Sequence, residues 1–347
     1  MDNISHAIIG SAVAALLPPG THAAVVGGVI VAAELPDLDV LIRAWAGELG
    51  YLRNHRGPTH GLISLVVEAV VITAVVRVIW PAVPVSQVFV WSLLGGLSHV
   101  LSDFGNDYGT QGLWPFSRRR VALDIIPIVD LWILGLFCAA WLLTWRWPGQ
   151  RQALFLIAWA SVAVYVTLRL WLKKRALALV STHFGVTDGA EEPIVSGPSW
   201  PAERVTVQPA LLSLRAWHYI VRKGGECLLG TVWVDRRRVG KPVRVRSQMD
   251  QAVKASLRSP AVATFADWVR IPHVTVERKE DRYLVRWSDL RYEMEGFSPF
   301  TAYAWLDKDL VVMDSGLGSQ RPPAMDRKAI ARRLRVEMGI EPDERDE

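Results

Sequence analysis

Cysteine is scarce in this sequence. Only two occur in 347 residues, Cys138 inside an apolar run and Cys227 far along the chain. Two distant thiols cannot build a disulfide framework, and they cannot form a zinc site of the cysteine type. Any metal ion would therefore have to be held by histidine and carboxylate side chains.

Charge is scarce in the first half of the chain. The first 172 residues contain ten acidic and ten basic side chains, whereas the rest contains 24 acidic and 29 basic ones. The net charge of +5 therefore arises from the second half. With 51% hydrophobic residues and a mean hydropathy of +0.21, the chain is too apolar for an ordinary soluble protein of this length. This composition excludes collagenous, coiled-coil and largely disordered chains, and also a uniformly basic nucleic-acid binder.

Long apolar runs fill the first half instead. Runs of about 20 residues match a hydrocarbon core of ~30 Å at a helical rise of ~1.5 Å per residue. The sequence has four such runs, at residues 62–80, 83–101, 125–145 and 153–172. Two shorter runs, 7–17 and 23–35, precede them and predict a helical hairpin that packs against the others or dips into the bilayer. We therefore predict a mainly α membrane helical bundle of four spanning helices plus an N-terminal helical hairpin.

The distribution of basic residues predicts the orientation of this bundle. Three arginines at 118–120 precede the third predicted span, and Lys-Lys-Arg at 173–175 follows the fourth, while the loop 146–152 holds only two arginines. Basic clusters favour the cytoplasmic side of a membrane. Alternation of the spans then places segments 52–61 and 100–124 on the same side. We predict an integral inner-membrane protein whose C-terminal domain is cytoplasmic.

Polar side chains gather at the helix ends that this topology assigns to the cytoplasmic face. They are His6, Asp37, Asp39, His55, Arg56, His60, His99, Asp103 and Asp124. His99 and Asp103 have i,i+4 spacing, so on one helix face both could reach one ion, although the same spacing is typical of a local hydrogen bond. The carboxylates of Asp37 and Asp39 directly follow a predicted helix C-terminus, where the helix dipole disfavours negative charge. That cost indicates a cation nearby.

The ligand types in this group indicate which metal ions could bind. Imidazoles and carboxylates without thiolates suit zinc, with manganese or iron as alternatives, rather than calcium. The donors suffice for two ions that share a carboxylate, so we expect a divalent metal pair. Ionisable residues at a membrane edge are functional candidates because an unpaired one is costly there. A structural polar network, or an ion or proton pathway, would use the same residues and stays open as an alternative.

A series of motifs in fixed order carries a family resemblance. The motifs are Met-Asp-x-x-Ser-His from Met1, Leu-Pro-Asp-Leu-Asp from Leu35, His-Arg-Gly-Pro-Thr-His from His55, Ser-His-x-x-x-Asp from Ser98, Tyr-Gly-Thr-Gln from Tyr108, Leu-Trp-Pro-Phe-Ser from Leu113 and Leu-Asp from Leu123. With them the chain resembles, over nearly its whole length, the membrane-bound, metal-dependent hydrolases of the YdjM-like family. The resemblance implies a distant similarity to zinc-dependent phospholipase C. It also implies His6, Asp37, His60, His99 and Asp103 as first choices for metal ligands, with His55, Asp39 and Asp124 next.

Such a site predicts hydrolysis by metal-activated water, because bound metal lowers the pKa of water toward ~7. Asp39 or Asp124 is the expected general base. Arg56 is the expected bidentate binder of an anionic substrate, unless it pairs with Asp37 or Asp39. We expect a phosphoester or lipid-linked substrate at the cytoplasmic membrane face, although a soluble substrate would suit the same ligands.

Two other classes of function compete with this hypothesis. The first is a membrane transporter or an ion or proton pathway lined by His99, Asp103, Glu68 and Asp130, of which Glu68 and Asp130 lie within the predicted spans. Transporters place essential charges near the bilayer midplane, whereas most of the polar residues here cluster at helix ends. The second is a non-catalytic regulatory membrane protein. The sequence predicts the lipid bilayer as a partner and leaves the oligomeric state open.

The second half of the chain predicts a separate domain. Glycines and prolines at 176–200 indicate a linker between a membrane-embedded metal-site domain, 1–175, and a cytoplasmic β-rich α/β domain, 201–347. The segments that read as strands are 227–234, 274–277, 283–287, 290–293 and 303–313, and residues 324–338 read as a final helix. The basic run 236–238 suits anionic lipid head groups at least as well as nucleic acid, and no nucleic-acid recognition motif occurs. We expect no nucleic-acid partner.

Overall fold

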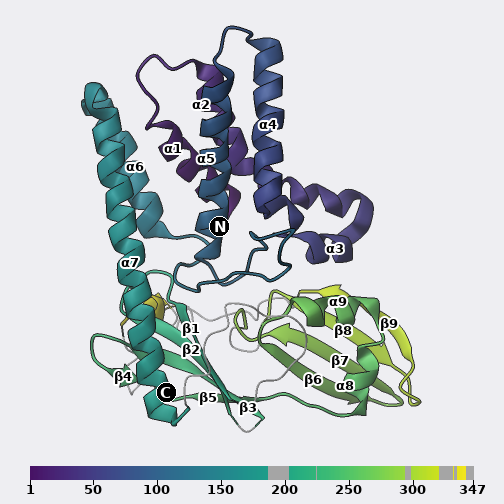
Figure 1. Cartoon of the computed structure of the whole chain (residues 1–347). Coiled ribbons are helices and arrows are strands. Elements are labelled where there is room, and N and C mark those ends of the chain that lie inside the picture. The colour runs from purple at the N-terminus through teal and green to yellow at the C-terminus, as the bar shows by residue number, and fades with distance from the viewer. Residues whose placement is uncertain (187–202, 224, 294–297, 320–330, 332–333, 341–347) are drawn as a thin grey trace. The chain divides into compact units, whose positions relative to one another are not determined.

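The chain folds into two compact units in a computed structural model, which describes residues 1–186, 203–223, 225–293, 298–319, 331 and 334–340 (Figure 1). The first unit comprises Met1–Leu41 and Asn54–Lys173, and the second comprises Ile42–Arg53 and Lys174–Glu347. All nine polar residues singled out from the sequence fall in the first unit.

The N-terminal hairpin consists of α1 (Asn3–Ala14) and α2 (Ala23–Glu34), and it packs against α5 (Val85–Phe104). The backbones of α2 and α5 approach closely at Gly95, where a Cβ atom would lie 2.3 Å from the carbonyl oxygen of Val29. Small residues permit this kind of contact between helices in membranes. The close packing brings the C-terminal part of α2 to the last turns of α5.

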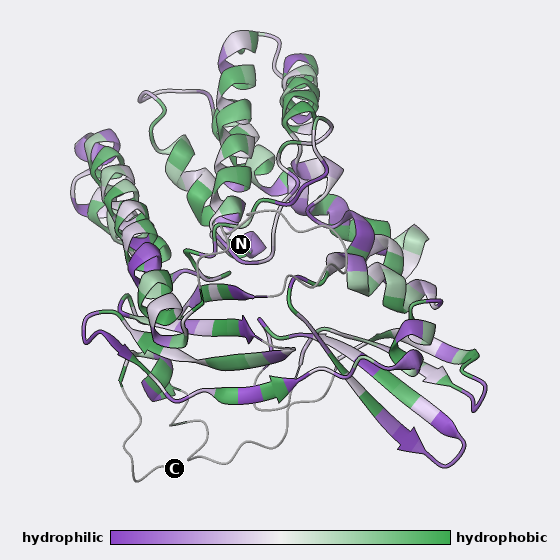
Figure 2. Cartoon of the chain, turned by 60° about the horizontal axis from the view of Figure 1, so that its bottom comes forward, coloured by the Kyte–Doolittle hydropathy of each residue, from purple (hydrophilic) through white to green (hydrophobic). Residues whose placement is uncertain are grey.

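Three helices of the described part of the chain are long and apolar enough to cross a membrane. They are α4 (Leu62–Ile79), α5 and α7 (Arg151–Phe184, preceded by the 3-10 helix η3, Pro148–Gln150), and most of their residues are hydrophobic (Figure 2). The third predicted span, 125–145, is shorter than expected, because α6 (Leu131–Arg146) has only 16 residues. Its start is fixed by Asp130, whose side chain accepts hydrogen bonds from the backbone N–H groups of residues 132 and 133.

A polar stripe on α7 holds the segment that follows α5. The hydrogen bonds run from the Tyr165 hydroxyl to Asp130 Oδ2 (2.6 Å), from Arg169 Nε to the Ile125 carbonyl (2.7 Å) and from Lys173 Nζ to the Leu123 carbonyl (2.6 Å). The three donors follow one another at i,i+4 spacing and therefore share a helix face. The charges within this span thus have partners in the protein.

The region expected to be a linker is partly helical. Helix α7 continues to Phe184, nine residues into the range 176–200, and ends where Gly185 adopts a positive φ of 62°. The helix end packs on the neighbouring sheet, where the Phe184 ring lies 5.5 Å from that of Tyr219 and Lys223 Nζ donates to the Phe184 carbonyl. This packing stabilises helix where composition alone indicated a linker. Residues 187–200 lie outside the described residues.

Two antiparallel sheets form most of the second unit. The first contains β1 (Arg204–Pro209), β2 (Ala216–Lys223), β3 (Glu226–Trp233) and β4 (Arg238–Val239) in that order, with β5 (Val243–Arg246) also paired to β3. The second contains β6 (Pro272–Lys279), β7 (Arg282–Asp289), β8 (Thr301–Leu306) and β9 (Val312–Gly318) in sequence order. Helices α8 (Gln251–Ser256) and α9 (Pro260–Trp268) pack against the second sheet.

Three further elements lie between α2 and α4. They are η1 (Leu35–Ile42), α3 (Arg43–Asn54) and η2 (Pro58–His60).

Two strand predictions are wrong. Residues 290–293 form a turn, because Arg291 folds back to pair with Asp289 and the Tyr292 N–H bonds to the Asp289 carbonyl. The run 303–313 is divided between β8 and β9 by a turn in which the Leu310 N–H bonds to the Asp307 carbonyl. Of the predicted final helix 324–338, residues 331 and 334–337 are helical, and the others except Met338 lie outside the described residues.

Candidate metal centre

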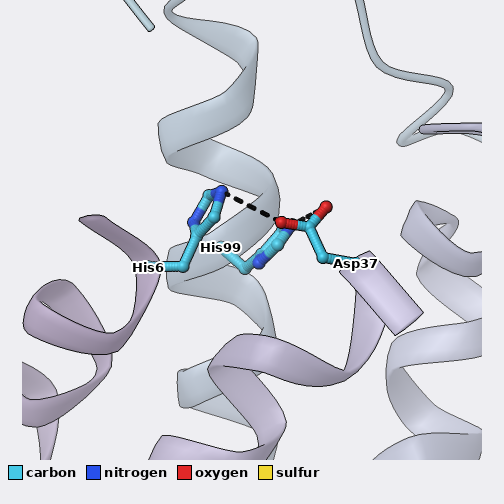
Figure 3. A group of neighbouring side chains, drawn as sticks. All are labelled: His6, Asp37 and His99. Atoms are coloured by element: carbon cyan, nitrogen blue, oxygen red, sulfur yellow. Dashed lines mark ion pairs between the residues drawn. The ribbon is translucent and has the colours of Figure 1, made fainter. Parts of the chain in front are cut away.

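Five ligand candidates from four segments meet inside the first unit. Helix α1 supplies His6, η1 supplies Asp37, η2 supplies His60, and α5 supplies His99 and Asp103. Asp37 is 8% exposed and the other four are fully buried. Figure 3 shows three of them, with the imidazoles of His6 and His99 both facing the carboxylate of Asp37.

The donor atoms form two triads that share His99. In the first, His60 Nε2, His99 Nε2 and Asp103 Oδ2 are separated by 3.1, 3.6 and 3.7 Å. Zinc bonds of 2.0–2.2 Å place tetrahedral ligands about 3.3–3.6 Å apart, so this triad has the size of one face of such a tetrahedron. In the second, Asp37 lies 3.9 Å from His6 Nε2 and 3.7 Å from His99 Nε2, and the two imidazole rings stack at 3.6 Å.

Three buried atoms of this cluster have no hydrogen bond to any residue that the structure describes. They are His6 Nε2, Asp37 Oδ1 and Asp103 Oδ2. A buried polar atom left in this condition typically costs about 1–3 kcal/mol. A cation among the imidazoles and carboxylates would bind all three atoms, so these residues fit a divalent metal ion with nitrogen and oxygen ligands.

The outer nitrogens of two imidazoles are fixed by neighbouring groups. His99 Nδ1 lies 2.7 Å from the carbonyl oxygen of Ala33, and because a carbonyl only accepts, Nδ1 carries the proton. His60 Nδ1 lies 3.0 Å from the hydroxyl of Thr59. Both rings therefore direct Nε2 toward the cluster, in the arrangement by which metal-binding histidines are usually oriented.

The ionisation of Asp37 also suits a cation. Burial alone would raise the pKa of this carboxyl group. The imidazole of His60, whose Nε2 lies 3.5 Å from Asp37 Oδ1, and the imidazoles of His99 and His6 outweigh burial and hold the pKa of Asp37 well below its usual range. Asp37 is therefore a carboxylate that contributes negative charge to the cluster at neutral pH.

Arg56 is buried beside the cluster, and its guanidinium is engaged by the protein. Nη1 donates to Asn106 Oδ1 (2.9 Å), and Nη2 donates to the Met1 carbonyl (2.9 Å) and lies 3.2 Å from Asp103 Oδ1. The α-amino group of Met1 pairs with the same oxygen of Asp103. These contacts favour a role for Arg56 in orienting Asp103 over the predicted role in binding substrate. Sequence reasoning missed Asn106 and Met1 as contributors to the cluster, and no spacing signal indicated them.

Three predicted residues lie outside the two triads. His55, expected as a ligand, instead places Nδ1 2.8 Å from Asp39 Oδ1, and its side chain is 16% exposed. The other oxygen of Asp39 accepts the Arg56 N–H (2.8 Å) and lies 3.9 Å from His60 Nδ1. Asp124 pairs with Lys173 at 3.6 Å. The carboxylates expected to act as general base are thus engaged with other residues.

The fold and the cluster define an integral membrane protein with a buried candidate metal centre. Residues 1–175 match the family described as YdjM inner membrane protein, so the chain belongs to this family. Residues 251–329, a range that begins with α8 and includes β9, match the YfhP C-terminal alpha/beta plait domain. The chain is also 27% identical to "Uncharacterized protein YfhP" of Bacillus subtilis (strain 168) over 332 residues, which cover 92% of this chain and 95% of that protein. No solved structure matches, and the similarity to phospholipase C stays a prediction.

Proposed function

We propose that this protein is a metal-dependent hydrolase of the inner membrane. The observation that carries the proposal is the pair of buried triads around His99, in which three polar atoms have no hydrogen bond within the described part of the chain. A divalent metal ion bound there, most simply zinc, would supply Lewis-acid activation of a substrate and of water at neutral pH. The five side chains of the triads would hold the ion.

We propose one ion in place of the two expected from the sequence. His99 belongs to both triads, but its Nδ1 is occupied by the Ala33 carbonyl and only Nε2 faces the cluster. A single imidazole nitrogen ligates one ion at a time. We therefore propose one ion per chain, shared among His6, Asp37, His60, His99 and Asp103.

The pair formed by His55 and Asp39 is our candidate for proton transfer. Asp39 lies within hydrogen-bond distance of His55 Nδ1, and this contact would orient the imidazole. His55 is partly exposed, unlike the four histidine and aspartate ligands that are fully buried. In this proposal His55 takes a proton from water and Asp39 positions it, in place of Asp39 or Asp124 acting alone.

The position of the cluster supports a substrate delivered from the membrane. His99 and Asp103 lie in the last two turns of α5, one of the helices long enough to span the bilayer. A lipid-borne substrate could therefore present its head group to the cluster. We propose a phosphoester or lipid-linked substrate, hydrolysed at the cytoplasmic membrane face.

The test is metal analysis of the detergent-purified protein beside a screen of phosphoester, phospholipid, peptide and carboxylester substrates. We expect one metal per chain in the wild type, and loss of both metal and activity in His99→Ala and Asp103→Ala. Membrane insertion should persist, because it depends on the apolar helices. His22→Ala is the matched control, since His22 caps α2 through Ala24 and touches neither triad.

A transport function predicts the opposite result. Purified wild-type protein would then contain no stoichiometric metal and hydrolyse nothing, while His99→Ala would abolish flux in liposomes. Of the two acids within the predicted spans, Glu68 and Asp130, the second has a structural role. Asp130 caps α6 and accepts a hydrogen bond from the Tyr165 hydroxyl. This contact favours the enzyme over a transport pathway through Asp130.

A further inference from the structure

A basic cleft of about 600 Å³ lies within the second unit, between the C-terminal part of α7 and β4. Helix α7 contributes Arg175, Ala178, Leu179, Thr182 and His183, and the hairpin contributes Arg237, Arg238 and Val239. The helix residues follow i, i+3, i+4 spacing and so lie on one face. The contacts of Phe184 with Tyr219 and Lys223 hold this helix end to the sheet, so the cleft is formed by the folded unit itself.

The lining of the cleft suits an anion. Three of its eight residues are arginines, one is a histidine, and none of the eight is acidic. Asp235, two residues before Arg237 in the chain, pairs with Arg215. Arg237 is exposed and has a positive φ of 51°, which turns the hairpin at this point. Guanidinium groups match the oxygens of phosphate in a bidentate manner.

The apolar residues of the cleft indicate that its ligand also has an apolar part. Ala178, Leu179 and Val239 lie among the basic residues, so the cleft combines cationic groups with a hydrophobic lining. Inorganic phosphate would use only the cationic groups. A phosphate that carries a glycerol backbone and acyl chains would use both.

The distance along α7 places the cleft beside the membrane surface. The apolar part of α7 ends near Leu172, so Arg175 lies roughly 4.5 Å further along the axis and His183 roughly 16 Å further, at ~1.5 Å per residue. The polar head-group layer on each side of a bilayer is about 5–8 Å thick. The end of the cleft at Arg175 therefore reaches the head groups.

We propose that this cleft binds the phosphate group of an anionic phospholipid in the leaflet from which α7 emerges. The site is separate from the metal centre and does not depend on hydrolase activity. Arg175, Arg237 and Arg238 contact the phosphate, and the apolar residues contact the glycerol region of the lipid.

The experiment is a lipid titration of the full-length, detergent-purified protein, followed by native mass spectrometry with phosphatidylglycerol or phosphatidylcholine. We expect wild-type protein to retain phosphatidylglycerol preferentially. The double variant Arg237→Gln/Arg238→Gln should bind it about thirtyfold more weakly, the loss expected for two basic side chains at a membrane surface. If the double variant folds poorly, Arg237→Gln alone, at an exposed turn position, should still weaken binding about fivefold.

The control variant Arg244→Gln/Arg258→Gln removes two exposed arginines of the same unit outside the cleft. It should bind phosphatidylglycerol as the wild type does. Equal weakening in both double variants, or equal binding of the two lipids by the wild type, would overturn the proposal. Displacement of the lipid by an excess of inorganic phosphate would also overturn it, because the source of the phosphate would then be soluble.

Discussion

Replacing Arg56 by lysine gives the sharpest test of how the cluster is held. Arginine at this position makes three contacts from its two terminal nitrogens, to Asn106, the Met1 carbonyl and Asp103. Lysine keeps the charge but has a single ammonium group, so it cannot reproduce the fork. Asn106 Oδ1 would lose its buried charged donor, although the Tyr108 N–H also bonds to this oxygen.

The expected effect is a weaker metal site. Loss of a group that orients a metal ligand typically lowers affinity by about 10- to 100-fold, which corresponds to about 1.4–2.8 kcal/mol. We expect Arg56→Lys to fall in this range, because Asp103 keeps its place in α5 but loses one of the groups that orient its carboxylate. Competition for zinc against a chromophoric chelator, with the protein in detergent at pH 7, measures the affinity directly.

The control for this experiment is Arg118→Lys, an exposed arginine of the same unit. Its zinc affinity should equal that of the wild type. An affinity of Arg56→Lys within twofold of the wild type would refute the orienting role of Arg56 while leaving the metal site intact. Unchanged affinity combined with a higher KM would instead support the substrate-binding role expected from the sequence.

Three further predictions address proton transfer, packing and topology. His55→Asn should keep bound metal, measured by elemental analysis, but lower kcat, because the side chain lies outside the two triads; loss of the metal would make His55 a ligand after all. Tyr165→Phe should lower the free energy of unfolding by about 1–3 kcal/mol, read from thermal denaturation in detergent, because it removes a buried hydrogen bond to Asp130; an unchanged midpoint would argue against that bond. Reporter fusions after Arg175 should behave as cytoplasmic and those at Gly149 as external, and the reverse pattern would contradict the predicted orientation.

The sequence signals that indicated the ligand candidates are local. Apolar runs fix where helices end, and the side chains of interest follow those ends directly, as at Asp37 after α2 and at His99 near the end of α5. The packing of helix ends then brings such residues together. The role of Asp124 could not be predicted in this way, because its partner Lys173 belongs to α7 and meets it only through tertiary packing.

Two strands that the sequence analysis missed, β2 and β5, were missed for different reasons. Strand β2 is buried at six of its eight positions, including Arg222 near its end, so polar and apolar residues do not alternate along it. Strand β5 has the sequence Val-Arg-Val-Arg but only four residues, too short to be distinguished from a loop. The length of the third predicted span was overestimated because a hydropathy plot does not show that Asp130 caps the start of a helix.

The hairpin of α1 and α2 contributes directly to the candidate metal centre. It supplies His6 from α1 and, through the carbonyl of Ala33 near the end of α2, fixes which nitrogen of His99 faces the cluster. Both contributions require α2 to lie directly against α5, and a Cβ at Gly95 would collide with the Val29 backbone at this contact. The short helices that cannot span a bilayer alone are therefore the elements that would shape the coordination of a metal ion on α5. In the proposed metal site, the packing of α2 against α5 leaves only Nε2 of His99 for a metal ion, because the Ala33 carbonyl occupies Nδ1.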